Sequence, residues 1–407
     1  MAVPTGAPLR VCYFNRSYWP DTGATGQLLT ELAEDLVAVH GIEVTVVTGY
    51  PITGEQLPAR ETRNGVRIVR AAGTTFAQRR FTGRAANYLT YFVSAVWAAV
   101  RLPRQDVTVA LTDPPIIGLA ALAARPRHGM VFFCQDIFPE VAGLLEDFHS
   151  PLANSILDQL NRFLVRRAAR IVALGDTMAL RLVEGKGAAG SKITVIHNWA
   201  DTAAIVPADK RNPFAIANDL AGRFVVLHAG NIGHGQNLDV VIDAAERLKS
   251  QPDILLLFIG DGNRKAALQE AVRARGLENV RFLPFQPRDQ LRWTYAASDV
   301  CLVSLKPGLG GCIVPSKLYP ILAAGRPYVA AVDASSEVGA LTAAHGAGVL
   351  AAPGDAGALA SAITTLADDP ARRQAMGARA REAAALFARD RQVAAHARVL
   401  FEVAGRC

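Results

Sequence analysis

The strongest constraint on the fold is a repeated alternation of short apolar segments with segments of helical periodicity. Runs of about five residues rich in Val, Ile, Leu and Phe predict buried strands, and the helical segments between them predict the crossovers of a parallel sheet. The first series begins with a strand at Arg10–Phe14 and an amphipathic helix at Gly26–Val39. Its further expected strands are Glu43–Val47, Val66–Arg70, Val107–Leu111, Met130–Cys134 and Ile171–Leu174.

A second strand–helix series begins after His197-Asn198-Trp199. Its expected strands are Arg223–Ala229, Ile254–Ile259, Val280–Leu283, Val300–Ser304 and Tyr328–Ala331, and its expected helices are Asn237–Lys249, Arg264–Arg275 and Ser316–Ala323. A chain of 407 residues is too long for one ordinary core. We therefore predict an α/β fold with two doubly wound, Rossmann-like domains, residues 1–205 and 206–385, that face an interdomain cleft.

The C-terminal segment, residues 386–407, is expected to be helical. It either ends the second domain as a plain helix or packs back onto the first domain. Ligands of doubly wound sheets bind at the carboxyl ends of the strands, so the candidate site residues are sought at those ends.

Composition and charge narrow the possible partners. The formal charge of +7 favours an anionic partner, and no nucleic-acid-binding motif accompanies it, so a phosphorylated substrate or a lipid surface is expected instead. The five cysteines form no C-x-x-C pair, which predicts reduced thiols and no zinc site. The N-terminal residues lack the apolar core of a signal peptide, which predicts a cytoplasmic protein, with peripheral contact at the inner face of the plasma membrane as an open alternative.

One segment, Ala85–Val100, carries no charge and contains four aromatic residues. Arg79, Arg80 and Arg84 precede it. It is shorter than the roughly 20 residues that span a bilayer. An apolar, aromatic helix with basic flanks is typical of a membrane interface, and a buried core helix is the alternative.

Three glycine-containing turns follow expected strands and are candidate anion sites, because glycines allow backbone amides to approach a ligand closely. Each also has a purely structural interpretation as a tight turn. The candidate substrate-binding residues of the first turn are Gly23, Thr25 and Gly26. Those of the second are Gly230, Asn231, Gly233 and Gln236, and those of the third are Asp261 and Gly262.

A fourth motif, residues 310–327, is more specific. A glycine-rich loop leads through Pro315 and Ser316 into an expected helix with Lys317 and Leu318 at its start. A hydroxyl, a cation and free amides at that point are suited to a diphosphate. We predict that Pro315, Ser316 and Leu318 bind substrate and that Lys317 is catalytic.

The ordered set of motifs resembles the family-four glycosyltransferases. In the second half the set is Gly-Asn-Ile-Gly, Ile-Gly-Asp-Gly, Val-Arg-Phe-Leu-Pro-Phe, Ala-Ser-Asp-Val, Pro-Ser-Lys-Leu-Tyr and Ala-Ala-Gly-Arg-Pro. In the first half it is Tyr-Trp-Pro-Asp, Gln-Asp-Ile-Phe-Pro-Glu and Ile-His-Asn-Trp-Ala-Asp. The resemblance covers nearly the whole chain. It is closest to the bacterial branch that builds O-antigen, capsule and colanic acid, including N-acetylfucosamine-type transferases.

The resemblance implies a GT-B fold and retaining sugar transfer without a bound metal or other cofactor. The donor would be a nucleotide-diphosphate sugar, most often UDP-linked and in some relatives N-acetylated, held by the second domain. Phe285 and Arg264 join the candidate donor-binding residues, and Glu337 either contacts the donor's sugar or ribose or caps a helix. The acceptor, lipid-linked or a polysaccharide, would lie on the first domain, where Gln135 is a candidate binding residue and Asp136 a candidate catalytic carboxylate.

Several positions depart from the family pattern. In relatives, two glutamates often bracket the loop that ends in Ala-x-Gly-x-Pro, and here these positions are Cys312 and Pro320. An Arg and a Lys common in the first phosphate turn are replaced by Asn231 and Gln236, and a frequent His by Gln135. These departures leave Lys317 as the clearest cation for the diphosphate. They also keep two alternatives open: a UDP-sugar 2-epimerase on the same fold, and a non-catalytic nucleotide-sugar-binding partner subunit.

Overall fold

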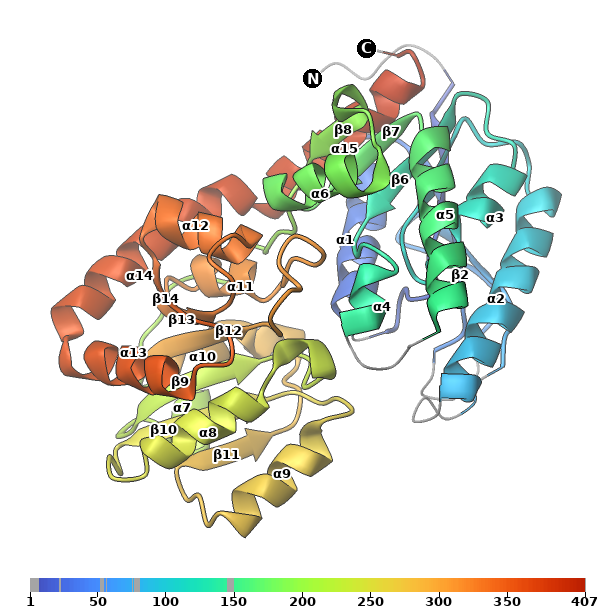
Figure 1. Ribbon diagram of the computed structural model, residues 1–407. Coiled ribbons are helices and arrows are strands. Elements are labelled where there is room, and N and C mark those ends of the chain that lie inside the picture. Colours follow the sequence, from blue (N-terminus) through green and yellow to red (C-terminus); the bar gives the residue numbers. More distant parts are fainter. Residues whose placement is uncertain are drawn as a thin grey trace. The chain divides into compact units, whose positions relative to one another are not determined.

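The computed structural model describes residues 7–21, 23–51, 55, 57–74, 76, 81–144 and 150–406 (Figure 1). Within these ranges the side chains of residues 81, 82 and 84 are not described. The chain forms two compact units. Unit 1 comprises Met1–His197 and Asp390–Cys407, and unit 2 comprises Asn198–Arg389.

In the part of the chain that the structure describes, unit 1 contains an eight-stranded sheet of order β3-β4-β2-β1-β5-β6-β7-β8. All of its neighbouring strands pair in parallel except β3, which runs antiparallel to β4 at the edge. The strands are β1 (Arg10–Phe14), β2 (Glu43–Thr48), β3 (Arg60–Arg63), β4 (Val66–Arg70), β5 (Val107–Ala110), β6 (Gly129–Cys134), β7 (Arg170–Ala173) and β8 (Ile193–Val195).

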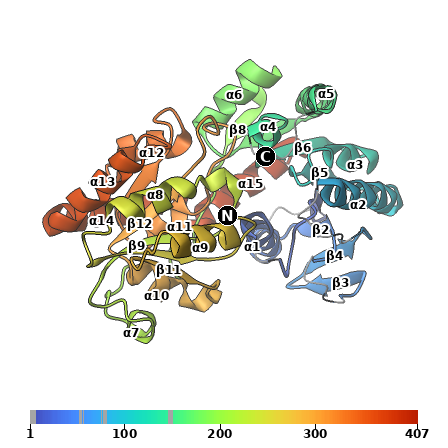
Figure 2. The same ribbon diagram turned by 60° about the horizontal axis from the view of Figure 1, so that its bottom comes forward.

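Helices cover both faces of the unit 1 sheet. The helices are α1 (Ala24–Ala38), α2 (Phe81–Arg101), α3 (Gly118–Ala123), α4 (Glu140–Leu144), α5 (Pro151–Arg167), α6 (Asp176–Lys186) and α15 (Arg389–Val403), with a short 3-10 turn η1 (Gly190–Lys192). Figures 1 and 2 show α2, α3 and α5 on one face and α1 on the other. Right-handed crossovers require this arrangement, because the chain moves along the sheet in opposite directions before and after β4.

Unit 2 contains a parallel six-stranded sheet, in the described residues, of order β11-β10-β9-β12-β13-β14. Its strands are β9 (Phe224–Ala229), β10 (Ile254–Ile259), β11 (Val280–Leu283), β12 (Val300–Ser304), β13 (Tyr328–Ala331) and β14 (Gly348–Ala351). The central strands are buried on both faces, as expected for a parallel sheet covered by helices. With unit 1, this sheet confirms the predicted fold class of two doubly wound α/β domains.

The helices of unit 2 pack around this sheet. They are α7 (Pro213–Ala217), α8 (Asp239–Arg247), α9 (Lys265–Ala274), α10 (Leu291–Ala296), α11 (Leu318–Ala323), α12 (Glu337–His345), α13 (Ala356–Asp368) and α14 (Pro370–Ala384), with 3-10 turns η2 (His234–Gln236), η3 (Arg288–Gln290) and η4 (Ala385–Phe387). A large apolar cluster joins α8 and α13 to the sheet, with Val241, Phe258 and Ile363 among its fully buried members. This cluster holds the strands whose carboxyl ends carry the candidate site.

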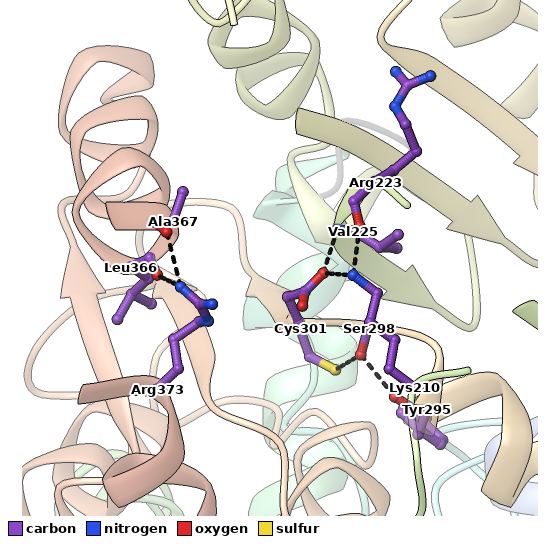
Figure 3. Close-up of polar contacts among 10 residues, drawn as sticks. Lys210, Arg223, Val225, Tyr295, Ser298, Cys301, Leu366, Ala367 and Arg373 are labelled. Atoms are coloured by element: carbon purple, nitrogen blue, oxygen red, sulfur yellow. Dashed lines mark hydrogen bonds and ion pairs between the residues drawn. The ribbon is translucent and has the colours of Figure 1, made fainter. Parts of the chain in front are cut away.

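Polar contacts at the amino ends of the unit 2 strands tie the preceding linker to the sheet (Figure 3). The Lys210 ammonium pairs with the Asp299 carboxylate, which also accepts a hydrogen bond of 2.7 Å from the backbone N–H of Val225. Farther along the chain, the Arg373 guanidinium donates to the carbonyls of Leu366 and Ala367 at the end of α13. These contacts satisfy backbone groups at strand and helix ends that would otherwise lack partners.

The chain changes units at 197/198 and at 389/390, whereas the sequence places the boundaries at 205/206 and 385/386. The reason is a backbone pairing within unit 2. Ala200 donates to the Phe387 carbonyl at 3.2 Å and accepts from the Arg389 N–H at 3.1 Å. This pairing holds both connecting segments together, a contact between distant positions that the local sequence pattern does not reveal.

Helix α15 belongs to unit 1, apart from its first residue. Its His396 ring lies 4.7 Å from the Phe133 ring of β6, measured between centroids. Beyond the helix, the Arg406 guanidinium donates to the Ala7 carbonyl at 2.6 Å. The end of the chain is therefore part of the first sheet's covering layer.

The apolar segment Ala85–Val100 lies in α2 and has two different faces. Tyr91, Ala95 and Ala99 are buried against the unit, and the Tyr91 hydroxyl donates to the Val47 carbonyl at 3.2 Å. The opposite face exposes apolar side chains: Leu89 at 59%, Val93 at 60%, Trp97 at 62% and Val100 at 56%. Arg79 and Arg80 lie outside the described residues, as does the side chain of Arg84. None of the described helices is long and apolar enough to cross a membrane.

His396 is expected to make unit 1 sensitive to acid. Burial lowers the pKa of His396 to about 3, whereas an unfolded His titrates near 6.5. Between these values the unfolded chain binds a proton that the folded chain does not. The contribution of His396 to the free energy of unfolding should therefore fall by about 1.4 kcal/mol per pH unit as the pH drops from 6.5 towards 3. Asp136, whose pKa is raised to about 7, acts in the opposite direction below pH 7.

Urea titrations followed by tryptophan fluorescence at pH 7.5, 6 and 5 measure this effect. The stability of His396→Phe relative to the wild-type protein should rise from pH 7.5 to pH 5, and that of His128→Gln, at an exposed position, should not. A difference between His396→Phe and wild type that is independent of pH would show that His396 is not the titrating group.

Candidate functional site

The turns after β9 and β10 in unit 2 are packed backbone to backbone. Gly230 N–H donates to the Ile259 carbonyl and Ile232 N–H to the Asp261 carbonyl, both at 2.8 Å. Gly260 has φ +147°, and a Cβ atom there would lie 1.9 Å from the Gly230 carbonyl oxygen. Gly262 has φ +157°, and a Cβ atom there would lie 2.3 Å from the Ile232 oxygen. Only glycine fits at these two positions. The turn at residues 260–262 therefore packs directly against the backbone of the turn at residues 230–232.

Gly260→Ala is expected to displace the β9 turn, because no side-chain movement can relieve a clash between a Cβ atom and a backbone oxygen. We expect a loss of stability of several kcal/mol, since both a strained φ and a steric overlap are introduced. The matched control is Gly222→Ala in the same unit, where a Cβ atom meets nothing within 4 Å. Thermal unfolding measures both variants. Equal midpoints for the two would refute the tight approach of the turns.

Lys317 lies immediately before α11 and extends over the β9 turn. Its Cε atom is 3.8 Å from the position that a Cβ atom of Gly230 would occupy. Its ammonium nitrogen is 3.2 Å from Nε2 and 3.5 Å from Nδ1 of His228, a fully buried residue on β9. The Lys317 side chain is partly exposed, yet burial lowers its pKa to about 7. The predicted cation and the predicted glycine turn are thus brought together.

The glycine-rich loop before Lys317 is fixed to the same strand ends. Lys306 N–H donates to the Gly235 carbonyl at 2.9 Å, and Gly308 N–H donates to the Asp333 carboxylate at 3.0 Å. A Cβ atom on Gly310 would lie 3.1 Å from Cβ of Ser336, which caps α12 by accepting from Gly339 N–H. The loop therefore bridges the ends of β9 and β13.

The remaining predicted residues of unit 2 are distributed along the same edge. Glu337 is buried in the first turn of α12, and Pro315 and Ser316 are partly buried in the segment leading to Lys317. Gly233 precedes η2, which contains Gln236, and the Oε1 atom of Gln236 is buried without a hydrogen-bond partner in the described residues.

Three further predicted residues, Asp261, Arg264 and Phe285, make no hydrogen bond or ion pair with Lys317 in the described part of the chain. Asp261 accepts from Gly262 N–H at 2.8 Å, and Arg264 pairs with the Asp239 carboxylate at 2.7 Å. Phe285 follows β11 and is 46% exposed. Asn231 is exposed on the β9 turn, and Leu318, the first residue of α11, is fully buried. The Arg264 guanidinium is therefore paired with Asp239 at the start of α8. Among the described residues, no contact directs it towards Lys317.

Unit 1 has a second polar cluster at the carboxyl ends of β1, β5 and β6. Arg16 Nε lies 3.3 Å from the Asp113 carboxylate, and the Ser17 hydroxyl donates to the other carboxylate oxygen at 2.9 Å. Arg16 also lies over the Tyr88 ring, 5.4 Å from its centroid. Arg16 and Asp113 are not among the residues predicted from the sequence. Their signal is positional, since each follows closely on the end of an apolar strand.

Asp136 is the carboxylate of this cluster with the most altered acidity. Burial, with a smaller contribution from the negative charge of Asp113, raises its pKa to about 7. Its backbone N–H donates to the Thr112 hydroxyl at 3.2 Å. Burial likewise raises the pKa of Asp21, although the Arg16 charge opposes that shift. A carboxyl that titrates near neutral pH is suited to exchange protons with a substrate hydroxyl.

The other predicted residues of unit 1 flank this cluster. Gln135 lies directly before Asp136 and is partly exposed. Gly23 precedes α1, Thr25 is in its first turn, and a Cβ atom on Gly26 would lie 3.2 Å from Cβ of Asp21. In the described residues, no group of His, Cys, Asp and Glu side chains could hold a metal ion.

Comparison with known proteins identifies both halves of the chain. Residues 23–199 match the "Glycosyl transferase 4-like domain" and residues 210–383 match "Glycosyl transferases group 1". The chain is 34% identical over 351 residues to the "Putative colanic acid biosynthesis glycosyl transferase WcaI" of Escherichia coli (strain K12), covering 82% of this chain and 86% of that protein.

Two solved structures are similar over almost the whole chain. Anabaena Alr3699/HepE in complex with UDP-glucose has a TM-score of 0.73 at 19% identity, covering 97% of this chain and 100% of that chain. Sucrose-phosphate synthase from Thermosynechococcus elongatus has a TM-score of 0.79 at 18% identity, covering 98% of this chain and 100% of that chain. The two α/β units, the matched domains and the identity to WcaI together establish that the chain belongs to the family-four glycosyltransferases of the GT-B fold.

Proposed function

We propose that this enzyme is a retaining glycosyltransferase of cell-surface glycan synthesis that moves a sugar from a UDP-linked donor to a lipid-linked or polysaccharide acceptor. The observation that carries the proposal is the placement of the Lys317 ammonium beside the glycine turn at Gly230. A cation beside a glycine turn at the carboxyl end of a strand suits the diphosphate of a nucleotide sugar. HepE was solved in complex with UDP-glucose, and the name of WcaI refers to colanic acid, which supports the donor and product classes proposed here.

In the proposed reaction the bond between the anomeric carbon and the diphosphate oxygen breaks, and the new bond to the acceptor oxygen forms on the same face of the sugar. The proton of the acceptor hydroxyl passes to the departing diphosphate. Lys317 stabilises the negative charge that develops on the leaving group. The donor sugar class includes N-acetylated amino sugars, and Phe285, exposed after β11, is proposed to stack on the nucleotide base.

The acceptor is proposed to bind to unit 1 at the cluster of Arg16, Asp113 and Asp136. The ionised Asp136 carboxylate would accept a hydrogen bond from the acceptor hydroxyl and orient it for attack. No metal is needed in this scheme, because Lys317 supplies the positive charge beside the diphosphate.

A thermal-shift screen of nucleotide sugars followed by a transfer assay tests the proposal. A UDP-sugar should raise the unfolding temperature of the protein, because a ligand that binds the folded state stabilises it. The same sugar should then be transferred to a lipid-linked acceptor with its anomeric configuration kept. Epimerisation of the donor without an acceptor would favour a 2-epimerase. Tight donor binding without transfer to any acceptor would favour a non-catalytic partner subunit.

We further propose that the exposed apolar face of α2 contacts a membrane surface that presents the acceptor. Leu89, Val93, Trp97 and Val100 recur at spacings of four, four and three residues, which places them on one side of the helix. The Arg101 guanidinium lies 3.1 Å from the centroid of the Trp97 ring. An aromatic, apolar stripe with basic neighbours, on a chain of net charge +7, suits an anionic bilayer.

Flotation with vesicles containing phosphatidylglycerol tests this surface. The wild-type protein should float with the vesicles, and the double variant Leu89→Ser/Trp97→Ser should remain at the bottom of the gradient. Val39→Ser, which removes a side chain exposed at 71% after α1, is the matched control. Equal flotation of the double variant and the control would exclude α2 as the contact.

A further inference from the structure

In unit 2, the buried ring of His228 contacts the amine of Lys317. The ring is fully buried on β9, 5.7 Å from the Phe258 ring on the neighbouring strand. Its Nε2 atom lies 3.3 Å from the Asn231 carbonyl oxygen. A carbonyl can only accept, so this contact assigns the ring hydrogen to Nε2 and leaves the Nδ1 lone pair as an acceptor.

The Lys317 amine lies against this ring, 3.2 Å from Nε2 and 3.5 Å from Nδ1. With the ring hydrogen on Nε2, the Lys317 ammonium can donate only to the farther nitrogen, Nδ1. Burial, assisted by the Lys317 charge, lowers the pKa of His228 well below its usual range, so the ring is neutral at physiological pH. The lysine therefore rests against a neutral acceptor and not against a carboxylate.

Among the described residues, the charged side chains on the segments next to Lys317 interact with groups other than Lys317. After β10, Asp261 accepts from Gly262 N–H, and Arg264 pairs with Asp239 of α8. After β13, Asp333 accepts from Gly308 N–H, and the charge of Glu337, in the first turn of α12, helps to raise the pKa of Tyr319. Burial is the cause that lowers the pKa of Lys317, to about 7.

We propose that His228 is a positioning residue that holds Lys317 over the glycine turns without a counter-charge, so that binding of the donor's diphosphate draws one proton from solvent onto Lys317. This inference rests on the proposed function, because it assumes a diphosphate at these turns. The step is a simple protonation, in which the neutral amine of Lys317 takes a proton from the bulk solution and becomes the ammonium that pairs with the phosphate oxygens.

The physical reason lies in the partner of the lysine. A carboxylate would keep the ammonium charged and would compete with the diphosphate for it. The neutral imidazole of His228 fixes the position of the Lys317 nitrogen but does not hold a proton on it. The negative charge of a bound diphosphate then raises the protonated fraction of Lys317. Above pH 7, donor affinity should then fall by up to tenfold per pH unit, because each bound donor must also take up a proton.

Isothermal titration calorimetry with UDP-glucose, in buffers of different ionisation enthalpy between pH 6 and 9, measures the proton uptake. UDP-glucose is the probe because its diphosphate diester carries no group that titrates in this range. The wild-type protein should take up almost no proton at pH 6 and close to one per bound ligand above pH 8. Lys317→Met should bind more weakly and take up none.

Binding at pH 8 without proton uptake would overturn the inference and leave the proposed function intact. An absence of binding at every pH would instead contradict the proposed donor class. The two failures are therefore distinguishable.

A second measurement needs no donor. Acetylation of the free protein at different pH values, followed by mass spectrometry of the Lys317 peptide, reports the ionisation of this amine. The midpoint should lie near pH 7 in the wild-type protein, and a midpoint equal to that of exposed lysines would refute the proposal.

His228→Phe tests the positioning role, because it keeps a ring against Phe258 and removes the acceptor. The acetylation midpoint should shift to lower pH, and donor affinity at pH 7 should fall about tenfold. His228→Gln, which keeps an acceptor atom, should restore most of the affinity. Unchanged midpoint and affinity in His228→Phe would assign the ring a packing role only.

Discussion

Lys317→Met should lower kcat/KM for sugar transfer by about 10²–10³-fold, the usual effect of removing one group that stabilises developing charge. Met has nearly the length of Lys and fills the same space over Gly230, so the fold should survive. The loss should appear in donor affinity and in kcat, because the ammonium pairs with the bound diphosphate and the charge on that group grows as the glycosidic bond breaks.

Steady-state kinetics together with thermal unfolding separate the chemical effect from a folding defect. Lys249→Met is the matched control, since the same substitution is made at an exposed position in unit 2. A Lys317→Met enzyme with near-normal turnover would show that the role assigned to Lys317 is wrong.

Asp136 should impose a dependence of transfer on pH. Its pKa is raised to about 7, so the carboxylate form is present above pH 7 and is lost as the pH falls. If the carboxylate orients the acceptor hydroxyl, kcat/KM should fall tenfold per pH unit below 7. Asp136→Asn should lower kcat/KM by about 10²–10⁴-fold and remove this dependence.

The Asp113 variant supplies a sharper test of the same cluster. Asp113 contributes negative charge that helps to raise the pKa of Asp136, and it pairs with Arg16. Asp113→Asn should therefore move the midpoint of the pH profile to lower values. Asp176→Asn, at an exposed position on α6, should leave the profile unchanged. A midpoint that moves upward, or a profile that ignores Asp136→Asn, would exclude this carboxylate as the titrating group.

The central strands of both sheets could be predicted from the sequence. The expected strands at Arg10–Phe14, Ile254–Ile259 and Val300–Ser304 have the bounds that the structure shows. Buried parallel strands are uniformly apolar, so the local pattern is sufficient to find them. This pattern does not predict strand β3 (Arg60–Arg63), because its residues are polar and charged and it is a strand only through its pairing with β4 at the sheet edge.

The glycine turns of the candidate site were also visible in the sequence, whereas their partners were not. The need for glycine at Gly260 comes from the Gly230 carbonyl on another turn. The engagement of Arg264 comes from Asp239 on α8, a pairing that no local motif indicates. Lys317 and Arg264 could both be predicted from the sequence as cations for the diphosphate. The pairing that occupies Arg264 could not.

The sequence by itself determined the two doubly wound units and the family, because apolar periodicity and ordered motifs are properties of the chain read locally. Only the tertiary structure decided the chemistry of Lys317 and Asp136. Their altered pKa values arise from burial, and for Asp136 also from the charge of Asp113. Burial and charge proximity depend on segments that meet only after folding, such as β9 with the residue before α11, and the end of β5 with the end of β6.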